Sequence, residues 1–367
     1  MRSPRLRARS RAARRPSRRS RPRRIARAGL WLLAWFGAAV SAVALVAVVA
    51  PVHHYELDLA AHFAPHALLV ALPGLFASLW LRRRALALSA LLWAGLAAVT
   101  VARYDRFPPA SAPPEPSLTV RVVVYNAFAR GAPRVDSDLD GTFRAWVEEV
   151  DADVLCLVDP PWFVERSGLW PSEQLPHVVE RASEDRDFGL TLLSRWPVRL
   201  EPLADRRRPE NRLSFAAHSS VIVEHPSGAE FLLTGAHPRS PRTERTWNLS
   251  FRWSRVDARL LRAWMNERPT VPVIFAGDFN TTPTGRLHAQ IKRETGLRSP
   301  VALFGQGTWP SWAPPALALP IDRVWISEGA RVTRAVVGPR VYSDHRPVMI
   351  EVQLPAVKRP ERPQSDQ

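Results

Sequence analysis

The stretch VPVIFAGDFNTTP, residues 271–283, is the most informative part of the chain. Its first half is apolar and β-branched, which predicts a buried strand over 271–276. Asp278 and Asn280 follow at the exit of that strand, where side chains two residues apart point to the same side. Such a pair can hold a hard metal ion or a phosphoryl oxygen. A simple Asp/Asn turn after a strand has the same pattern, so this motif alone does not decide the function.

A second polar motif, YSDHRP, residues 342–347, stands directly before the strand-like segment VMIEV. A histidine beside an aspartate at a strand entrance can orient a water molecule or stabilise a phosphoryl group, provided that a carboxylate fixes its tautomer. For His345 the candidate carboxylate is Asp322, in the segment PIDRVWIS. Taken singly, each of these residues is more often part of a capped turn or a surface ion pair.

The rest of the second half of the chain is rich in strand-like segments. Strands are predicted over 118–126, 153–158, 177–181, 189–193, 213–224, 231–237, 321–327 and 348–354. Helices are predicted over 142–150, 243–267 and 284–295. Because helices are fewer than strands, two packed sheets with helices outside fit better than a regular alternation of strand and helix. The fold class is therefore α/β.

Charge and cysteine content exclude several classes of protein. Residues 1–27 contain thirteen arginines and no acidic residue, and residues 28–106 contain five basic and three acidic residues. These two segments therefore carry most of the net charge of +17, and only +2 remains for residues 107–367. A basic nucleic-acid-binding domain is therefore disfavoured, and nucleic acid is not expected as a partner. The single cysteine, Cys156, lies in the apolar run VLCLV, which excludes intramolecular disulfides and favours a buried structural thiol.

Three apolar runs in the N-terminal third predict transmembrane helices over 28–52, 63–81 and 85–102. The second run contains Pro73 and is the weakest of the three. Buried helices of a soluble protein, or a signal peptide for the first run, are the alternatives, although the first run is longer than a typical signal peptide. The domain organisation expected is an Arg-rich cytoplasmic tail (1–27), a membrane region (28–106), a Pro-rich linker (107–117), a catalytic domain (118–355) and a polar tail (356–367).

The arginines predict how the membrane region is oriented. The N-terminal tail and the triplet Arg82–Arg84 should both stay in the cytoplasm, because cytoplasmic segments carry an excess of positive charge. With three spans, the loop over 53–62 and everything after Arg103 then lie outside. We therefore expect a multi-pass protein of the cytoplasmic membrane with an extracytoplasmic catalytic domain. No protein partner can be inferred from the sequence.

The polar motifs occur together in an order that resembles the endonuclease/exonuclease/phosphatase family of metal-dependent phosphoesterases. They are Asn126 at the end of the first strand, the acid after DADVLCLV, LLSRWP, GAHP, GDFNTTP, IDRVWIS and SDHRPV. The resemblance covers roughly residues 118–355. With three N-terminal spans and GTWP before the ID motif, the chain looks like the membrane-anchored, VanJ-like subgroup.

The resemblance implies a four-layer, DNase I-like α/β sandwich that uses Mg²⁺, with Mn²⁺ as the alternative, to hydrolyse a phosphoester by in-line attack of water. The metal side would consist of Asn126, Asp159 and Asp344. Asp278 would orient the water, Asn280 would bind a phosphoryl oxygen, and His237 would stabilise the transition state. Asp322 would orient His345. These roles agree with a hard cation's preference for oxygen ligands and with the charge that develops on phosphoryl oxygens.

One position departs from the family pattern. The family usually has Glu where this chain has Asp159, so the metal could be held through water or by another acid such as Glu165. Three arginines are further candidates for phosphate contacts: Arg239, Arg242 and Arg323. For Arg323 a surface position is an equal alternative.

The leading functional hypothesis is a membrane-anchored phosphatase whose substrate partner is a lipid-linked phosphate or pyrophosphate of the undecaprenyl type. A phosphodiesterase, either a nuclease or a phospholipid-cleaving enzyme, is the second hypothesis. The third is a binding module whose catalytic residues have decayed, for which Asp159 would be the first sign.

Overall fold

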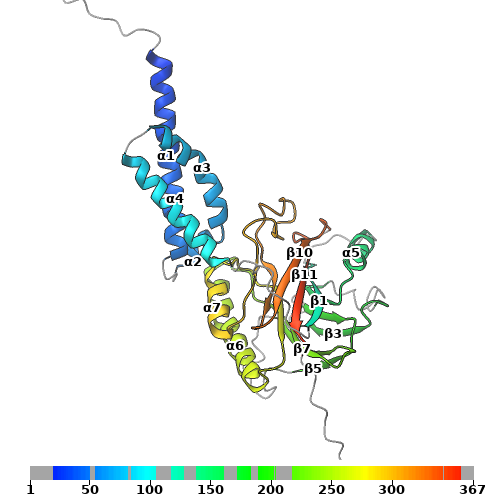
Figure 1. Cartoon of the computed structure of the whole chain (residues 1–367). Coiled ribbons are helices and arrows are strands. Elements are labelled where there is room, and N and C mark those ends of the chain that lie inside the picture. The colour runs from blue at the N-terminus through cyan, green and yellow to red at the C-terminus, as the bar shows by residue number, and fades with distance from the viewer. Residues whose placement is uncertain are drawn as a thin grey trace, which may run out of the picture.

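The chain forms a bundle of N-terminal helices followed by an α/β domain (Figure 1). The computed structural model describes residues 20–49, 54–81, 84–104, 117–127, 138–160, 172–182, 189–201, 203, 217–341 and 343–356. Residues 1–19 of the Arg-rich tail, residues 107–116 of the predicted linker, Glu165 and residues 357–367 of the polar tail lie outside these ranges.

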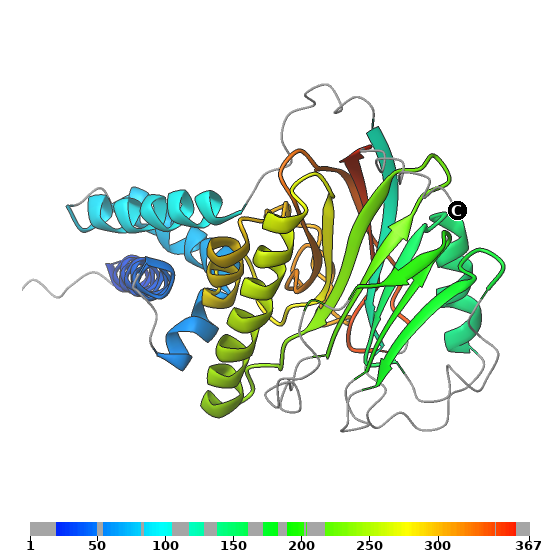
Figure 2. The ribbon, with the colours of Figure 1, turned by 90° about the horizontal axis from the view of Figure 1, so that it is seen from below.

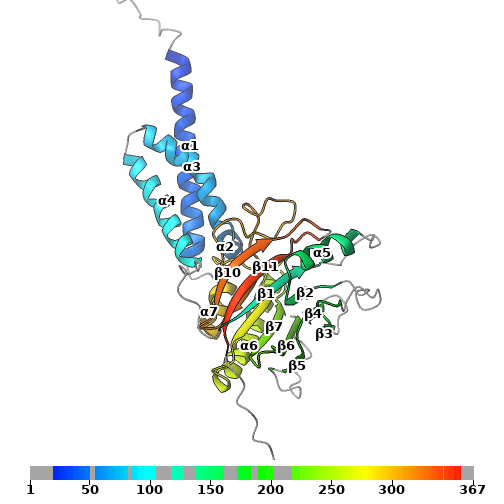
Figure 3. The same cartoon turned by 45° about the vertical axis from the view of Figure 1, so that its right-hand side comes forward.

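The N-terminal region contains the helices α1 (Ser20–Val49), α2 (Tyr55–Ala61), α3 (Ala64–Leu81) and α4 (Arg84–Arg103). Helices α1, α3 and α4 pack side by side, and the short helix α2 lies at the junction with the α/β domain (Figures 1 and 3). Two segments, Arg24–Val49 and Ala64–Leu81, are long and apolar enough to cross a membrane, whereas the apolar helix Leu88–Arg103 is shorter. The third predicted span is therefore not confirmed. The segment before α3, expected to be a loop, contains α2.

Glycine allows α1 and α3 to approach until their backbones touch. A Cβ atom added at Gly74 would lie 2.6 Å from the carbonyl oxygen of Leu33 and 2.7 Å from the Cα of Gly37. A Cβ at Gly37 would meet the Cα of Gly74 at 2.8 Å. Because no side chain fits between these two glycines, they set the distance between the helices.

Replacing Gly74 by Ala is expected to destabilise the helical bundle. Gly to Ala inside a helix normally stabilises by roughly 0.5–1 kcal/mol, but overpacking a close contact costs about 1–3 kcal/mol. The matched control is Gly95→Ala on α4, where the added Cβ meets only a Leu45 methyl at 3.6 Å. Thermal unfolding in detergent should give a lower Tm for Gly74→Ala and an equal or higher Tm for Gly95→Ala. Equal Tm values for the two variants would contradict the close contact.

The α/β domain is built on two sheets. The six-stranded sheet has the order β10-β11-β1-β2-β4-β3, and the five-stranded sheet has the order β5-β6-β7-β8-β9. The strands of the first sheet are β1 (Ser117–Asn126), β2 (Val154–Val158), β3 (His177–Ala182), β4 (Gly189–Ser194), β10 (Arg331–Val337) and β11 (Val348–Pro355). Those of the second are β5 (Val198–Leu200), β6 (Ala217–Glu224), β7 (Glu230–His237), β8 (Val273–Asp278) and β9 (Asp322–Ile326).

The two sheets pack face to face and helices cover both outer faces, giving four layers. Between the sheets lies a core of buried aliphatic side chains, among them Val122, Val124, Leu233 and Ile274. Helix α5 (Asp138–Glu149) packs on the six-stranded sheet, while α6 (Glu244–Glu267) and α7 (Arg286–Thr295) cover the five-stranded sheet (Figure 2). The predicted α/β sandwich is thus confirmed.

Two strands were missed from sequence. Strand β5 has only three residues, too few to show an alternating pattern. Strand β10 has a register irregularity between Val332 and Arg334, which interrupts its alternation. Of the strand predicted over 213–224, the structure describes residues 217–224.

Candidate active site

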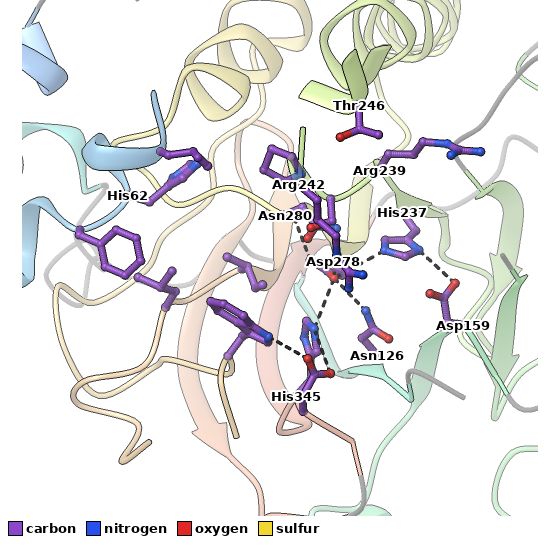
Figure 4. A pocket seen from close by; sticks show the side chains of 18 of the residues that line it. His62, Asn126, Asp159, His237, Arg239, Arg242, Thr246, Asp278, Asn280 and His345 are labelled. Atoms are coloured by element: carbon purple, nitrogen blue, oxygen red, sulfur yellow. Dashed lines mark hydrogen bonds and ion pairs between the residues drawn. The ribbon is translucent and has the colours of Figure 1, made fainter. Parts of the chain in front are cut away.

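The polar residues singled out by the sequence motifs meet at one end of the two sheets (Figure 4). Asn126 ends β1 and Asp278 ends β8, while His237 ends β7 and Asp159 directly follows β2. Strands β1 and β2 run parallel, as do β7 and β8, so their carboxyl ends lie at the same edges. Asp322 begins β9, which is antiparallel to β8, and is paired with Asp278 in the register.

The turn after β8 depends on two backbone conformations. Gly277 has φ +149°, and a Cβ atom there would lie 1.9 Å from the carbonyl oxygen of Ala236, so only glycine fits beside β7. Asn280 has φ +49°, a left-handed conformation that Asn tolerates better than most residues. The backbone N–H of Asn280 donates to Asp278 Oδ1 at 2.8 Å. This hydrogen bond fixes the carboxylate of Asp278 at the strand end.

Asp278 is the centre of the polar cluster, and it is only 1% exposed. The side-chain amide of Asn126 donates to Asp278 Oδ2 at 2.8 Å. The Nε2 atoms of His237 and His345 lie 3.6 Å and 3.8 Å from the same oxygen. The side-chain amide of Asn280 also donates to this oxygen, at 3.3 Å. A single buried carboxylate oxygen therefore faces two amides and two imidazoles.

Each of these histidines is hydrogen-bonded through its Nδ1 atom to a second carboxylate. His345 Nδ1 donates to Asp322 Oδ2 at 2.7 Å, and His237 Nδ1 donates to Asp159 Oδ1 at 3.1 Å. Burial opposes the charge of His345, but Asp322 and Asp278 outweigh burial and raise its pKa to about 9. Burial likewise disfavours charged His237, and Asp159 followed by Asp278 raises its pKa above the ordinary value. Both Nε2–H groups can therefore serve as cationic donors within the cluster.

These groups line a cavity of about 520 Å³. Eight residues predicted from sequence as site residues line it: Asn126, Asp159, His237, Arg239, Asp278, Asn280, Asp344 and His345. Arg242, a further candidate for a phosphate contact, also lines it. Asp322 lies behind His345, as expected for a residue that orients the imidazole.

The model of the endonuclease/exonuclease/phosphatase family matches residues 124–345, which is more than half of the chain. The chain belongs to the endonuclease/exonuclease/phosphatase family. Members of this family are hydrolases that act on phosphoester bonds, generally with divalent metals. A comparison with curated proteins finds no match.

Solved structures of endonuclease/exonuclease/phosphatase proteins resemble this chain at low identity. The protein from Beutenbergia cavernae is 19% identical, with a TM-score of 0.48 over 64% of this chain and 72% of its own. The protein from Bacteroides thetaiotaomicron is 17% identical, with a TM-score of 0.47 over 65% and 98%. Sphingomyelinase C from Streptomyces griseocarneus is 15% identical, with a TM-score of 0.45 over 64% and 99%. None of these similarities indicates which phosphoester this chain hydrolyses.

The residues present fit the divalent cation that the endonuclease/exonuclease/phosphatase family uses. The carboxylates of Asp159, Asp278 and Asp344 line one cavity, and hard cations prefer oxygen ligands. Asp344 Oδ2 accepts from Trp309 Nε1 at 3.0 Å, whereas its buried Oδ1 has no hydrogen-bond partner among the described residues. Potential ligand atoms of Asp278, Asp322 and His345 also lie within 4.8 Å of one another.

Arg323, predicted to bind substrate, does not line the cavity. Its side chain is 1% exposed and donates through Nη2 to the carbonyl oxygen of Thr281 at 2.6 Å. Successive side chains on a strand point to opposite faces, so on β9 the side chain of Arg323 points away from the polar cluster that contains Asp322. The guanidinium instead lies 5.5 Å from the ring centre of Trp325, two residues on, and burial lowers its pKa to about 10. This placement does not support a phosphate contact by Arg323.

Several residues of the cavity were not predicted from the sequence. Four come from α2 and the two residues that follow it, namely Tyr55, Leu59, His62 and Phe63. Trp309, Leu319 and Ile321 come from the segment before β9. Of these, Trp309 lies in the GTWP motif and Ile321 in the IDRVWIS motif, so a signal for both was present. The N-terminal residues belong to none of the motifs and lie far from the catalytic domain in sequence, so nothing in their local pattern indicates this position.

Proposed function

We propose that this chain is a membrane-anchored, Mg²⁺-dependent phosphoesterase that hydrolyses a lipid-linked phosphate or pyrophosphate. The observation that carries the proposal is the cavity around Asp278, with two carboxylate-held histidines, set directly beside the apolar N-terminal helices. An anchored site gains a high effective concentration over a substrate confined to the same membrane. Mn²⁺ is the alternative metal.

In the proposed reaction, Asp278 orients the attacking water, and Asn280 holds a phosphoryl oxygen. The cationic imidazoles of His237 and His345 donate hydrogen bonds to oxygens on which negative charge develops in the transition state. Asp322 positions His345, and Asp159 positions His237 through the hydrogen bond described above. Arg239 and Arg242 line the same cavity and are candidates for binding a second phosphate of a pyrophosphate.

The metal would be held by Asn126, Asp159 and Asp344. When bound, a divalent cation neutralises part of the phosphoryl charge. Asp159 is shorter than the Glu usual in the family, and its Oδ1 already accepts from His237. We therefore assign Asp159 both to the metal side and to the orientation of His237.

The arrangement of the helices is consistent with an extracytoplasmic active site. The end of α1, the whole of α2 and the end of α4 lie beside the catalytic domain, whereas the start of α1 and the end of α3 lie away from it (Figure 1). The Arg-rich tail and the Arg82–Arg84 triplet adjoin those distant ends. If these arginines remain in the cytoplasm, the catalytic domain lies outside. The VanJ-like subgroup and an undecaprenyl-pyrophosphate-type substrate of the cell envelope agree with this placement.

The proposal is tested by phosphate release from the full-length protein in detergent, with and without Mg²⁺. The substrate panel contains polyprenyl pyrophosphates, phospholipids, nucleotides and plasmid DNA. Metal-dependent release of phosphate from the polyprenyl substrate, absent in an Asp278→Asn variant, is the expected result. Plasmid nicking or phospholipid cleavage without polyprenyl hydrolysis would favour a phosphodiesterase instead. No turnover of any substrate, together with no Mg²⁺ or Mn²⁺ binding in calorimetry, would favour a binding module.

A further inference from the structure

One wall of the catalytic cavity comes from the N-terminal helical region. Tyr55 and Leu59 of α2, together with Phe63 just beyond it, line the cavity, although α3, α4 and the linker separate them in sequence from the catalytic motifs. Their spacing of four residues places Tyr55 and Leu59 on one face of the helix, and Phe63 continues the series. The N-terminal region is therefore part of the site.

Buried hydrogen bonds fasten α2 to the catalytic domain. Asp58 is 3% exposed, and its carboxylate accepts from Trp247 Nε1 and from the backbone N–H of Arg286, both at 2.7 Å. The carboxylate of Asp58 thus lies at the N-terminus of α7, where a negative charge is stabilising. At the C-terminal end of α2, Thr284 Oγ1 donates to the carbonyl oxygen of Ala61 at 2.7 Å. Contacts at the middle and at the C-terminal end hold α2 in place.

The cavity has a polar end and an apolar side. The polar end contains the carboxylates and imidazoles around Asp278, and Figure 4 shows His62 on the opposite side from His237 and Asp159. The apolar side consists of Leu59 and Phe63 from the N-terminal region and of Leu319 and Ile321 from the segment before β9. A substrate that fits both ends carries a phosphate joined to an apolar group.

The apolar side continues toward the helix α3. Phe63 is 49% exposed and immediately precedes α3, one of the two segments long and apolar enough to cross a membrane. His66 on α3 lies 2.7 Å, through its Nε2 atom, from the carbonyl oxygen of Leu317, whose side chain is 49% exposed. The first turn of α3 is thus in contact with the segment that carries Leu319. An apolar path leads from α3 past Phe63 and Leu59 into the cavity.

We propose that this path holds the hydrocarbon chain of the substrate, with the first units of the chain against Leu59 and Phe63 and its phosphate at Asp278. The inference rests on the proposed lipid phosphatase function and adds that the N-terminal helices select the substrate as well as anchor the enzyme. Water-soluble phosphates without a hydrocarbon chain lack the group that this wall contacts, so the presence of the chain should govern specificity.

The test compares two substrates that share a pyrophosphate group, a long-chain polyprenyl pyrophosphate and methyl pyrophosphate, which has no isoprene unit to contact Leu59 or Phe63. The full-length variants Leu59→Gln and Phe63→Gln are assayed in detergent beside Leu200→Gln, an exposed leucine on β5 that does not line the cavity. We expect each of the first two variants to reduce the ratio of kcat/KM, long chain over methyl, by about tenfold, as loss of a buried apolar contact implies. Leu200→Gln should keep the wild-type ratio. Wild-type ratios in both Leu59→Gln and Phe63→Gln would overturn the inference.

A binding measurement separates this inference from the proposed function. A long-chain polyprenyl pyrophosphate with a photoreactive group in its first isoprene unit should label the peptide over 55–63 in the Asp278→Asn protein. If that peptide is labelled but the wild-type protein hydrolyses no lipid phosphate, the proposed activity is wrong and the chain path stands. Hydrolysis by wild type with labelling elsewhere would defeat the chain path alone. If the wild type hydrolyses no lipid phosphate and the peptide over 55–63 is not labelled, both the proposed activity and the chain path are wrong.

Discussion

Replacing Asp278 by Asn is expected to lower kcat for phosphate release by about 10³-fold while the protein stays folded. Asn has nearly the same shape as Asp but carries no charge. An amide nitrogen in the place of Oδ2 would also face the four donor groups that now point at that oxygen, those of Asn126, Asn280, His237 and His345. The carboxylate that is proposed to orient the water, and that faces both imidazoles, would be lost.

The control for Asp278→Asn is Asp151→Asn. Asp151 is also an aspartate of the catalytic domain, but its side chain is 55% exposed and pairs with Arg121 and Arg195 away from the cavity. Its replacement should leave kcat within about twofold, since exposed ion pairs contribute little to stability. Phosphate release at saturating substrate and Mg²⁺ gives kcat, and circular dichroism checks the fold. An Asp278→Asn protein with more than a tenth of wild-type kcat would exclude the proposed role.

Replacing Asp322 by Asn is expected to lower kcat by about 10²-fold or more through its effect on His345. Asp322 Oδ2 accepts from His345 Nδ1 at 2.7 Å, and this carboxylate is a main cause of the raised pKa of His345. With a neutral amide at 322, the imidazole loses both the charge that keeps it protonated and the acceptor that fixes its orientation. Its Nε2–H would then be a weaker donor in the proposed contact with the phosphoryl group.

A double-mutant cycle distinguishes action through His345 from a general structural defect. If Asp322 acts by positioning His345, Asp322→Asn should cost little further activity in a His345→Gln background, because residues that act as a unit are strongly non-additive. The kcat values of wild type, both single variants and the double variant complete the cycle. Fully additive losses would mean that Asp322 does not act through His345.

Much of the site could be predicted from sequence because its residues stand at strand ends. The apolar run before Asp278 and the β-branched run before Asn126 are local patterns that specify where a buried strand stops. Neighbouring parallel strands end at the same edge of a sheet, which brings His237 close to Asp278 on one sheet and Asn126 close to Asp159 on the other. The meeting of these two edges was expected from the resemblance to the family, because the packing of the two sheets has no local signal in the sequence.

Two features of the site depended on three-dimensional placement. A strand presents successive residues to opposite faces, but the sequence does not say which face of β9 turns toward the cavity. Arg323 was therefore predicted to bind substrate, whereas its side chain is buried beside the ring of Trp325. Asp159 was expected on the metal side, and the structure adds its hydrogen bond to His237, a residue on the other sheet. That contact depends on how the two sheets are packed.

The sequence by itself determined the α/β class, most strand positions and the apolar N-terminal helices, since each follows from local composition and periodicity. The set of polar residues at the site followed instead from the resemblance of the motifs to those of the family. Only the tertiary structure decided that α2 completes the cavity, because the contacts of Asp58 with Trp247 and Arg286 join segments about 190 and 230 residues apart. Contacts at that separation depend on the packing of whole elements, and no local pattern encodes them.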